Sequence, residues 1–192
     1  TGTAIFGIGI IQDITDQKKA EERLRELATR DGLTGLYNRR YFLERGEKEL
    51  ARAIRYDTQL AFIMFDADHF KNVNDNYGHD VGDTVLKKIA EVSFATFREI
   101  DIIGRVGGEE FAVILPGTSH SGAKQASMRL KELISETKIK SDSGELNITV
   151  SIGIALISKK TKNLDNLMKN ADIALYEAKK NGRNRIEIFS ES

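Results

Sequence analysis

The 192-residue sequence contains no cysteine, which excludes disulfide scaffolds and thiolate metal sites and suits a reducing compartment. Its formal net charge is zero, so no overall charge draws the chain toward nucleic acid. No stretch approaches the roughly 20 consecutive apolar residues that a membrane-spanning helix needs. The apolar run at residues 4–11 is too short for a span and lacks the basic flank of a signal peptide. We therefore expect a cytoplasmic fragment without direct contact to nucleic acid or membrane, and a membrane-attached parent protein stays an open alternative.

The hydrophobic pattern from residue 39 onward predicts helices and strands in the order α-β-α-β-β-α-β-α-β. An antiparallel hairpin lies inside this alternation, and the sole proline, Pro116, ends its second strand. We therefore expect an α/β (α+β) architecture with a mixed, mostly antiparallel central sheet flanked by helices. The expected helices cover 39–56, 80–98, 121–138 and 164–180, and the expected strands cover 60–68, 101–106, 110–116, 148–156 and 185–189.

The N-terminal thirty residues predict two units that precede this domain. Residues 1–12 are rich in Ile and Gly and read as a strand with no hairpin partner nearby. Residues 13–30 contain a charged helix in which Ala20, Leu24 and Leu27 recur at spacings of four and three. That short apolar seam suits a connector helix that pairs with a copy of itself. The main domain is expected at residues 31–190.

An acidic segment, Asp66-Ala67-Asp68, follows the apolar strand at 60–65. A buried strand holds a carboxylate at its end rigidly and leaves it facing solvent. Mg²⁺ favours one or two carboxylates together with water and substrate phosphate oxygens. The segment is therefore a candidate metal site, and a solvated strand end is the alternative.

The predicted hairpin carries Gly107-Gly108-Glu109-Glu110 at its turn. Two glycines fit a two-residue turn with positive φ angles and leave no side chain to keep a phosphate from the backbone. Consecutive strand residues point to opposite faces, so the two glutamates should have different partners. Alone, the pattern also fits a plain turn with exposed acids. Beside a second acidic strand end it predicts a two-carboxylate metal site for displacement at phosphorus.

Two further groups of polar residues could bind a nucleotide. Asn74 and Asp83 can present an amide and a carboxylate to a base, and a carboxylate that accepts from two N–H groups would choose guanine. Such residues are also ordinary turn formers. Lys179 and Arg183 flank Gly182 at a helix end, where cations are favoured in any case and could also hold a triphosphate.

Six blocks, in order along residues 30–189, resemble the GGDEF family, the diguanylate cyclases. The blocks are DGLTGLYNRR, FDADHFKNVND, YGHDVGD, RVGGEEF, VSIGIA and ADIALYEAKKNGRN. The resemblance implies the palm-like nucleotide-cyclase fold and the condensation of two GTP into cyclic di-GMP with release of two pyrophosphates. It further implies that two domains face each other in a homodimer, each holding one GTP. This chain has Glu109 where the family name has Asp, and active members carry both forms.

The resemblance also implies a role for each matched residue. Asp66, the backbone carbonyl of Ala67 and Glu109 would hold Mg²⁺, or alternatively Mn²⁺. Glu110 would be a further metal ligand or would help to activate the 3′-hydroxyl group. Gly107 and Gly108 would let the hairpin approach the nucleotide. Guanine would be read by Asn74 and Asp83, and the β- and γ-phosphates would be held by Lys179, Arg183 and the backbone around His69 and Phe70.

A second motif, Arg98-Glu99-Ile100-Asp101, resembles the RxxD product-inhibition site of the same family. Arg98 would fork onto a guanine or phosphate of bound cyclic di-GMP, Asp101 would accept from the base, and Arg129 would be a secondary arginine. An ordinary surface ion pair is the alternative. Residues 9–16 resemble the end of a PAS sensor domain, which would explain the unpaired strand.

The sequence thus leaves two functional hypotheses from different classes. The first is an active, product-inhibited diguanylate cyclase that works across a homodimer. The second is a catalytically idle receptor that binds cyclic di-GMP through Arg98 and Asp101. The intact hairpin favours the enzyme.

Overall fold

The computed structural model describes residues 14–141 and 144–190. Its helices and strands follow each other as α1 (Thr15–Thr29), β1 (Tyr37–Asn38), α2 (Arg39–Tyr56), β2 (Leu60–Ala67), α3 (Phe70–Tyr77), α4 (His79–Thr96), β3 (Ile102–Arg105), β4 (Glu110–Pro116), α5 (His120–Glu136), β5 (Lys138–Ser141), β6 (Gly144–Asn147), β7 (Val150–Leu156), α6 (Leu164–Lys180) and β8 (Ile186–Ile188). Among these residues no helix is long and apolar enough to cross a membrane.

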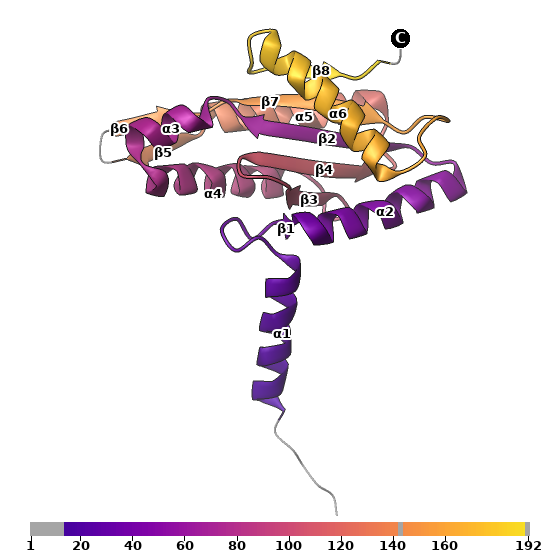
Figure 1. The fold of residues 1–192 in the computed structure, drawn as a ribbon, viewed down its shortest axis with the longest axis horizontal. Helices are drawn as coiled ribbons and strands as arrows, with labels where there is room; N and C mark the ends of the chain where they lie inside the picture. Colours follow the sequence, from indigo (N-terminus) through magenta and orange to yellow (C-terminus); the bar gives the residue numbers. More distant parts are fainter. Residues whose placement is uncertain (1–13, 142–143, 191–192) are drawn as a thin grey trace, which may run out of the picture.

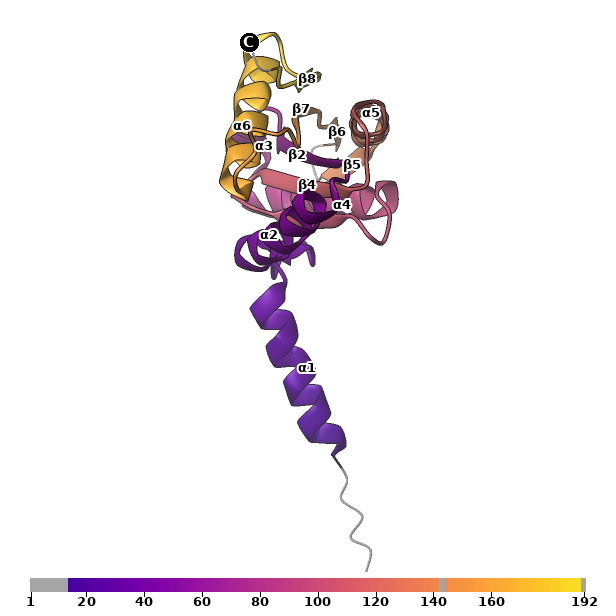
Figure 2. The ribbon, with the colours of Figure 1, turned by 90° about the vertical axis from the view of Figure 1, so that its right-hand side faces the viewer.

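The central sheet has six strands in the order β1-β3-β4-β2-β7-β8, and β5 pairs with β6 in a separate hairpin. The four inner strands are antiparallel, whereas β1 and β8 run parallel to their neighbours at the two edges. The prediction of a mixed, mostly antiparallel sheet is confirmed. Figures 1 and 2 show the sheet between helices on both of its faces.

Each face of the sheet has its own core because side chains alternate along a strand. Ala61, Ile63 and Phe65 of β2 face one side and pack with residues of α3, α4 and α5. Phe62 and Met64 face the other side and pack with residues of α2 and α6. All eight residues of β2 are buried, which explains why its sequence is continuously apolar up to the acids at its end.

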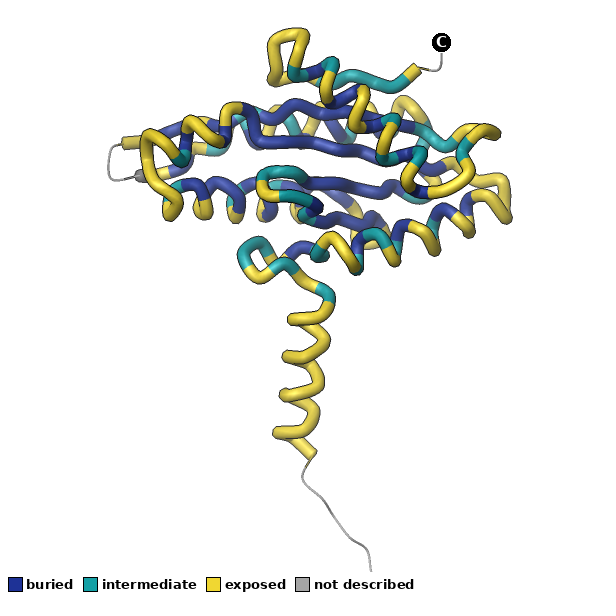
Figure 3. The backbone as a smooth tube through the Cα atoms, viewed as in Figure 1, coloured by how far each residue is buried: buried dark blue, intermediate teal, exposed yellow. Residues whose placement is uncertain are grey.

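Helix α1 extends away from the domain (Figures 1 and 2) and buries none of its residues. Leu24 and Leu27 of the predicted apolar seam are 66 % and 72 % exposed, and Figure 3 shows nearly all of the helix as exposed. The end of α1 is nevertheless fixed to the domain: the Ala28 carbonyl accepts from Asn38 Nδ2 at 3.0 Å and from Arg40 Nη2 at 2.7 Å. The apolar residues of the seam are thus largely exposed, while the C-terminal end of α1 is anchored to the domain.

Three features of the fold were not predicted. No helix was predicted at residues 70–77, but this segment forms α3, since Phe70 and Val73 are buried in the core and outweigh the weak helix propensity. Helix α5 ends at Glu136, before the predicted end at residue 138, and β5 and β6 lie between it and the next strand, where no strand was predicted. The two-residue strand β1 is too short to leave a pattern. The strand predicted at residues 1–12 lies outside the described residues.

Candidate active site

The candidate site forms where the C-terminal end of β2 meets the start of β4. Asp66 lies directly opposite Glu110 in the antiparallel pairing of these strands. Both residues belong to the sheet face that α6 covers, because Met64 and Ala112, each two residues away along its strand, pack in that core. The two acidic strand ends predicted to meet on one sheet are therefore adjacent.

Lys179 from the last turn of α6 completes this cluster. Its Nζ lies 2.9 Å from Asp66 Oδ2, and the Asp66 side chain is only 7 % exposed. Burial raises the pKa of Asp66 to about 6; Lys179 lowers this pKa, and the charges of Glu109 and Glu110 raise it. Asp66 is thus a carboxylate held among other acids, and a cation is what stabilises its charged form.

These acids were tested for their fit to a divalent metal ion. Within residues 14–141 and 144–190, no three or more His, Asp or Glu side chains form a ready set of metal ligands. Mg²⁺ however needs only one or two carboxylates when water and substrate phosphates supply the remaining ligands. Glu109 and Glu110 are close enough to Asp66 to oppose its ionisation. The donor set therefore fits a divalent cation that is shared with a phosphate ligand.

The hairpin turn differs from the two-residue, positive-φ turn that the sequence predicted. Val106 and Gly107 both donate their N–H groups to the Glu110 carbonyl, at 2.9 and 3.2 Å, so the turn is longer and Glu109 belongs to it instead of to the strand. The positive-φ glycines among the described residues do not include Gly107 or Gly108. A Cβ on Gly107 would lie 2.3 Å from Glu110 Oε2, the flexible end of that side chain, so a larger residue here would make Glu110 move. Gly108 is exposed and has no neighbour that would exclude a side chain.

Two arginines that the sequence did not single out hold this turn. Arg39 Nη1 donates to the Val106 carbonyl at 2.8 Å, and Arg105 donates to the Gly108 carbonyl from Nε at 3.1 Å and from Nη2 at 2.7 Å. Arg105 Nη1 also lies 3.1 Å from Asp31 Oδ1. The turn is therefore fixed from outside by charge-assisted hydrogen bonds, as a site that must hold its geometry requires.

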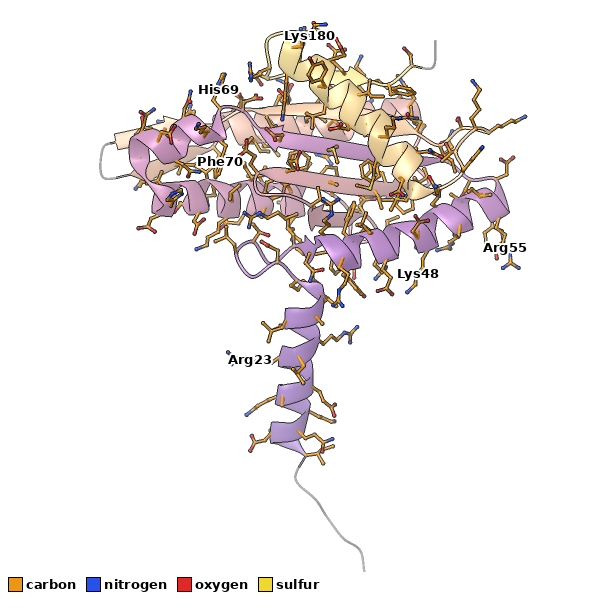
Figure 4. All side chains as sticks on the ribbon, in the orientation of Figure 1. Arg23, Lys48, Arg55, His69, Phe70 and Lys180 are labelled. Atoms are coloured by element: carbon orange, nitrogen blue, oxygen red, sulfur yellow. The ribbon has the colours of Figure 1, made fainter. Side chains whose placement is uncertain are left out.

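His69 and Phe70 lie where β2 passes into α3 (Figure 4). His69 has a left-handed backbone with φ of 58° and precedes the helix, and its carbonyl accepts from the Asn72 N–H at 2.8 Å. The first N–H groups of a helix have no partner within the helix and attract phosphate. The backbone predicted to hold phosphate is therefore at a helix start that directly follows Asp66 and Asp68.

Asn74 lies on α3 and Asp83 on α4, two helices that pack against each other. Gly82 allows this approach: a Cβ on Gly82 would lie only 2.0 Å from Asn74 Oδ1. Asp83, the next residue, is exposed. The structure thus places the Asn74 amide against α4 at Gly82, one residue before the exposed Asp83.

Lys179 and Arg183 lie at the C-terminal end of α6, whose neighbour Lys180 is labelled in Figure 4. The chain leaves the helix through Gly182, Arg183 and Asn184, which all have positive φ angles of 111°, 61° and 46°. The predicted glycine after the helix is confirmed. The two following non-glycine residues in the same conformation were not predicted.

Asp68 has a role that its place in the acidic segment did not reveal. It is 3 % exposed, and its carboxylate accepts from Thr149 Oγ1 at 2.7 Å, from Ser151 Oγ at 2.6 Å and from the Asn184 N–H at 3.0 Å. These donors lie more than eighty residues away along the chain, so only the fold brings them together. The Asp68 carboxylate therefore forms its hydrogen bonds with groups of the protein itself.

Arg98, Asp101 and Arg129 line one cavity of about 300 Å³ between the α4–β3 connection and α5. Arg98 and Asp101 are also paired with each other, because Asp101 accepts from the Arg98 backbone N–H at 2.8 Å and from Arg98 Nη2 at 3.1 Å. The Asp101 side chain is 2 % exposed and that of Arg98 is 55 % exposed. The three predicted residues therefore share a site, in which Arg98 offers the accessible group.

Comparisons with known proteins identify the family and the fold of the chain. The family model described as "Diguanylate cyclase, GGDEF domain" matches residues 28–185. A probable diguanylate cyclase of Escherichia coli, DgcC, is 36% identical over 184 residues, which are 96% of this chain and 49% of that protein. The chain spans about half the length of the curated relatives that it matches.

Two solved structures are similar throughout the domain. The coiled coil and GGDEF domain of DgcB from Caulobacter crescentus, in complex with c-di-GMP, has a TM-score of 0.85 at 32% identity, covering 92% of this chain and 93% of that one. The active GGEEF domain of a diguanylate cyclase from Vibrio cholerae has a TM-score of 0.77 at 32% identity, covering 81% of this chain and 98% of that one. With its fold, its acidic strand ends and its matched residues in agreement, the chain belongs to the GGDEF family of diguanylate cyclase domains.

Proposed function

We propose that this chain is an active diguanylate cyclase domain that condenses two GTP into cyclic di-GMP and two pyrophosphates. The observation that carries the proposal is the pairing of Asp66 with Glu110 across β2 and β4, with Lys179 Nζ 2.9 Å from Asp66. Acids that need a cation, beside a lysine that suits a phosphate, match the demands of phosphoryl transfer. The similar Vibrio cholerae domain, described as active, carries the same GGEEF form.

In this proposal Asp66, the Ala67 carbonyl, Glu109 and Glu110 hold Mg²⁺, with Mn²⁺ as a substitute. The metal, when bound, would neutralise the phosphates and the charge that develops during displacement at phosphorus. Lys179 would turn from Asp66 to the phosphates, and Arg183 and the start of α3 would hold the β- and γ-phosphates. Asn74 and Asp83 would select guanine by accepting from its N–H groups and donating to its acceptor atoms.

The reaction needs two copies of the domain. The 3′-hydroxyl group of each GTP gives up its proton, for which Glu110 is the candidate acceptor, and its oxygen bonds to the α-phosphorus of the other GTP. The bond from that phosphorus to the oxygen that bridges to the β-phosphate breaks, and pyrophosphate leaves with that electron pair. Gly107 and Gly108 leave room for the nucleotide beside the hairpin. Helix α1 would bring the copies together, because its exposed Leu24 and Leu27 offer a seam for a second α1. The upstream PAS-like unit would set the geometry of that pair.

The cavity lined by Arg98, Asp101 and Arg129 is proposed as the product-inhibition site. An idle receptor that binds cyclic di-GMP through the same cavity is the second candidate, and the similar DgcB structure contains c-di-GMP. The cyclase and the receptor hypotheses differ only in whether the chain converts GTP into cyclic di-GMP. We expect Asp66→Ala and Glu109→Ala to abolish cyclic di-GMP formation from GTP and Mg²⁺ while the circular dichroism spectrum stays that of the parent chain. Full activity in both variants would overturn the metal assignment.

A further inference from the structure

The starting point is the turn that carries Arg183. Gly182, Arg183 and Asn184 have φ angles of 111°, 61° and 46° in succession. A left-handed conformation is easy for glycine and tolerable for asparagine, but it is strained for a residue as large as arginine, and such residues persist only where their surroundings hold them. The Arg183 N–H donates to the Ala178 carbonyl at 3.0 Å, which ties the turn to its own helix.

Outside helix α6, the turn is fixed by Asp68. Its Oδ2 accepts the Asn184 N–H at 3.0 Å, and Thr149 and Ser151 fix the carboxylate by donating their hydroxyl groups at 2.7 and 2.6 Å. The Asp68 N–H also donates to the Thr149 carbonyl at 2.8 Å. Because Asp68 is 3 % exposed and its carboxylate accepts three hydrogen bonds, this side chain is held in one position at the end of β2.

Asp66 and Asp68 therefore hold the two parts of the α6 terminus separately. Asp66 takes the Lys179 ammonium group, and Asp68 takes the backbone of the turn that follows. The Arg183 guanidinium makes no hydrogen bond or ion pair with the described residues, and it is exposed. The backbone of Arg183 is strained and anchored beside the site, and its guanidinium group remains available. This arrangement suits the binding of an external anion.

We propose that Asp68 is a positioning residue for triphosphate binding: it fixes the 181–184 turn so that Arg183 meets the phosphates of a nucleotide bound at the end of β2. The inference rests on the proposed triphosphate role of Lys179 and Arg183. It assigns Asp68 no metal and no contact with substrate. Its effect passes through the Asn184 N–H.

Two substitutions distinguish positioning from metal binding. In Asp68→Asn the amide oxygen can still accept from Thr149 and Asn184, and Ser151 can turn its hydroxyl to accept from the amide nitrogen. Asp68→Ala removes every acceptor. If Asp68 positions the turn, we therefore expect Asp68→Asn to keep triphosphate binding and Asp68→Ala to lose it. If the Asp68 carboxylate bound a metal ion, both substitutions would abolish that role. Thr149→Val is the matched control, because it removes one partner and leaves the carboxylate to hold the turn.

The binding test uses a GTP analogue with a methylene bridge between the α- and β-phosphorus atoms, which cannot release pyrophosphate, and GMP for comparison. Asp68→Ala should lower the affinity for the analogue by about 10-fold or more and leave that for GMP unchanged. Arg183→Ala should give a similar loss, and the double variant should lose no more than either single one, since both remove the same contact. Additive losses, equal losses for GMP, or failure of the asparagine variant to restore binding would each overturn the proposal.

A second measurement does not depend on nucleotide chemistry. Arg183 and Arg185 are exposed trypsin sites in the turn itself. Asp68→Ala should be cleaved there about 10-fold faster than the parent chain, with Asp68→Asn and Thr149→Val near the parent rate. Unchanged cleavage in a folded Asp68→Ala variant would refute the anchoring role even if the chain makes cyclic di-GMP. Faster cleavage without any turnover would leave anchoring supported and count against the proposed function.

Discussion

Arg105 Nη1 lies 3.1 Å from Asp31 Oδ1, and the same guanidinium donates to the carbonyl of Gly108 in the hairpin turn. Asp31 follows helix α1 by two residues, so a single side chain links the root of the connector helix to the turn that carries Glu109. Both side chains of the pair are mostly buried, at 16 % and 24 % exposure. A change in the orientation of α1 would therefore act through Asp31 and Arg105 on the hairpin turn of the candidate active site.

We expect Asp31→Asn to lower cyclase activity by about 10-fold or more, since Arg105 loses the partner that orients it on the Gly108 carbonyl. At neutral pH the variant should also lose about 2 kcal/mol of unfolding free energy, as for a hydrogen bond to a charged group. Urea unfolding and initial rates measure the two effects. Thr34→Val, which removes another partner of Asp31 but leaves the ion pair, should affect activity less; equal losses would contradict the link.

The same carboxylate gives a pH dependence. Burial raises the pKa of Asp31, but hydrogen bonds from Thr34 and the Arg105 charge outweigh it, and the pKa lies below its ordinary value of 3.8. Its contribution to stability is therefore present above pH 3.8 and lost as the pH falls through the folded value. Parent and Asp31→Asn stabilities should converge in acid. A constant difference between them would contradict this assignment.

Asp66 should behave in the opposite way in metal-free protein. Burial raises the pKa of its carboxyl group from 3.8 to about 6, so the folded state favours the protonated acid, and that stability is present below pH 3.8 and lost as the pH rises through about 6. We expect Asp66→Asn to be more stable than the parent chain by about 2–3 kcal/mol at pH 8 in EDTA, at about 1.4 kcal/mol for each pKa unit. Thermal unfolding at several pH values measures this.

The gain in Asp66→Asn should vanish below about pH 4, where both side chains are neutral. A loss of stability at pH 8 would show that the Lys179 pair outweighs burial. Such a variant should form no cyclic di-GMP in either case.

A substitution at Gly82 tests guanine selection without replacing Asn74 or Asp83. A Cβ at this position would lie 2.0 Å from Asn74 Oδ1, so Gly82→Ala must displace the Asn74 amide. We expect the KM for GTP to rise by about 10-fold while kcat changes little, because ground-state binding is lost. Gly32→Ala, where a Cβ would meet nothing within 4 Å, is the matched control. An unchanged KM would remove Asn74 from the base site.

Arg98→Ala tests the proposed inhibition site. In this variant the backbone N–H of residue 98 can still donate to the Asp101 carboxylate, so we expect the local structure to be retained. We expect the reaction to run on without slowing as product accumulates, while the parent chain slows. Progress curves with added cyclic di-GMP measure this, and equal inhibition of both proteins would identify the Arg98–Asp101 contact as an ordinary ion pair.

Sequence pattern predicted most of the sheet because its strands are long, apolar and bounded by acids or glycines. It placed Asp66 beside the hairpin since both lie at strand ends. It could not predict the function of Asp68, whose partners Thr149, Ser151 and Asn184 meet it only in the fold. The prediction of positive φ angles for Gly107 and Gly108 was wrong because the turn is longer than two residues, with Val106 and Gly107 both donating to the Glu110 carbonyl. Helix α3 was missed because two core contacts outweigh its polar composition.

The dependence on two copies is expected to appear as a concentration effect. Removing residues 1–29 should lower the activity per domain at dilute protein, since Leu24 and Leu27 of the seam are lost. Activity per domain measured over a dilution series, with the full chain in parallel, tests this. Identical activity of both proteins at every dilution would count against pairing through α1.

The central claim is tested most directly by incubating the chain with GTP and Mg²⁺ and identifying the product by mass spectrometry, with Glu109→Gln as the matched control. The account predicts cyclic di-GMP and two pyrophosphates for each product molecule from the parent chain, and none from the variant. Binding of cyclic di-GMP without turnover at any protein concentration would contradict the account and identify the chain as a receptor.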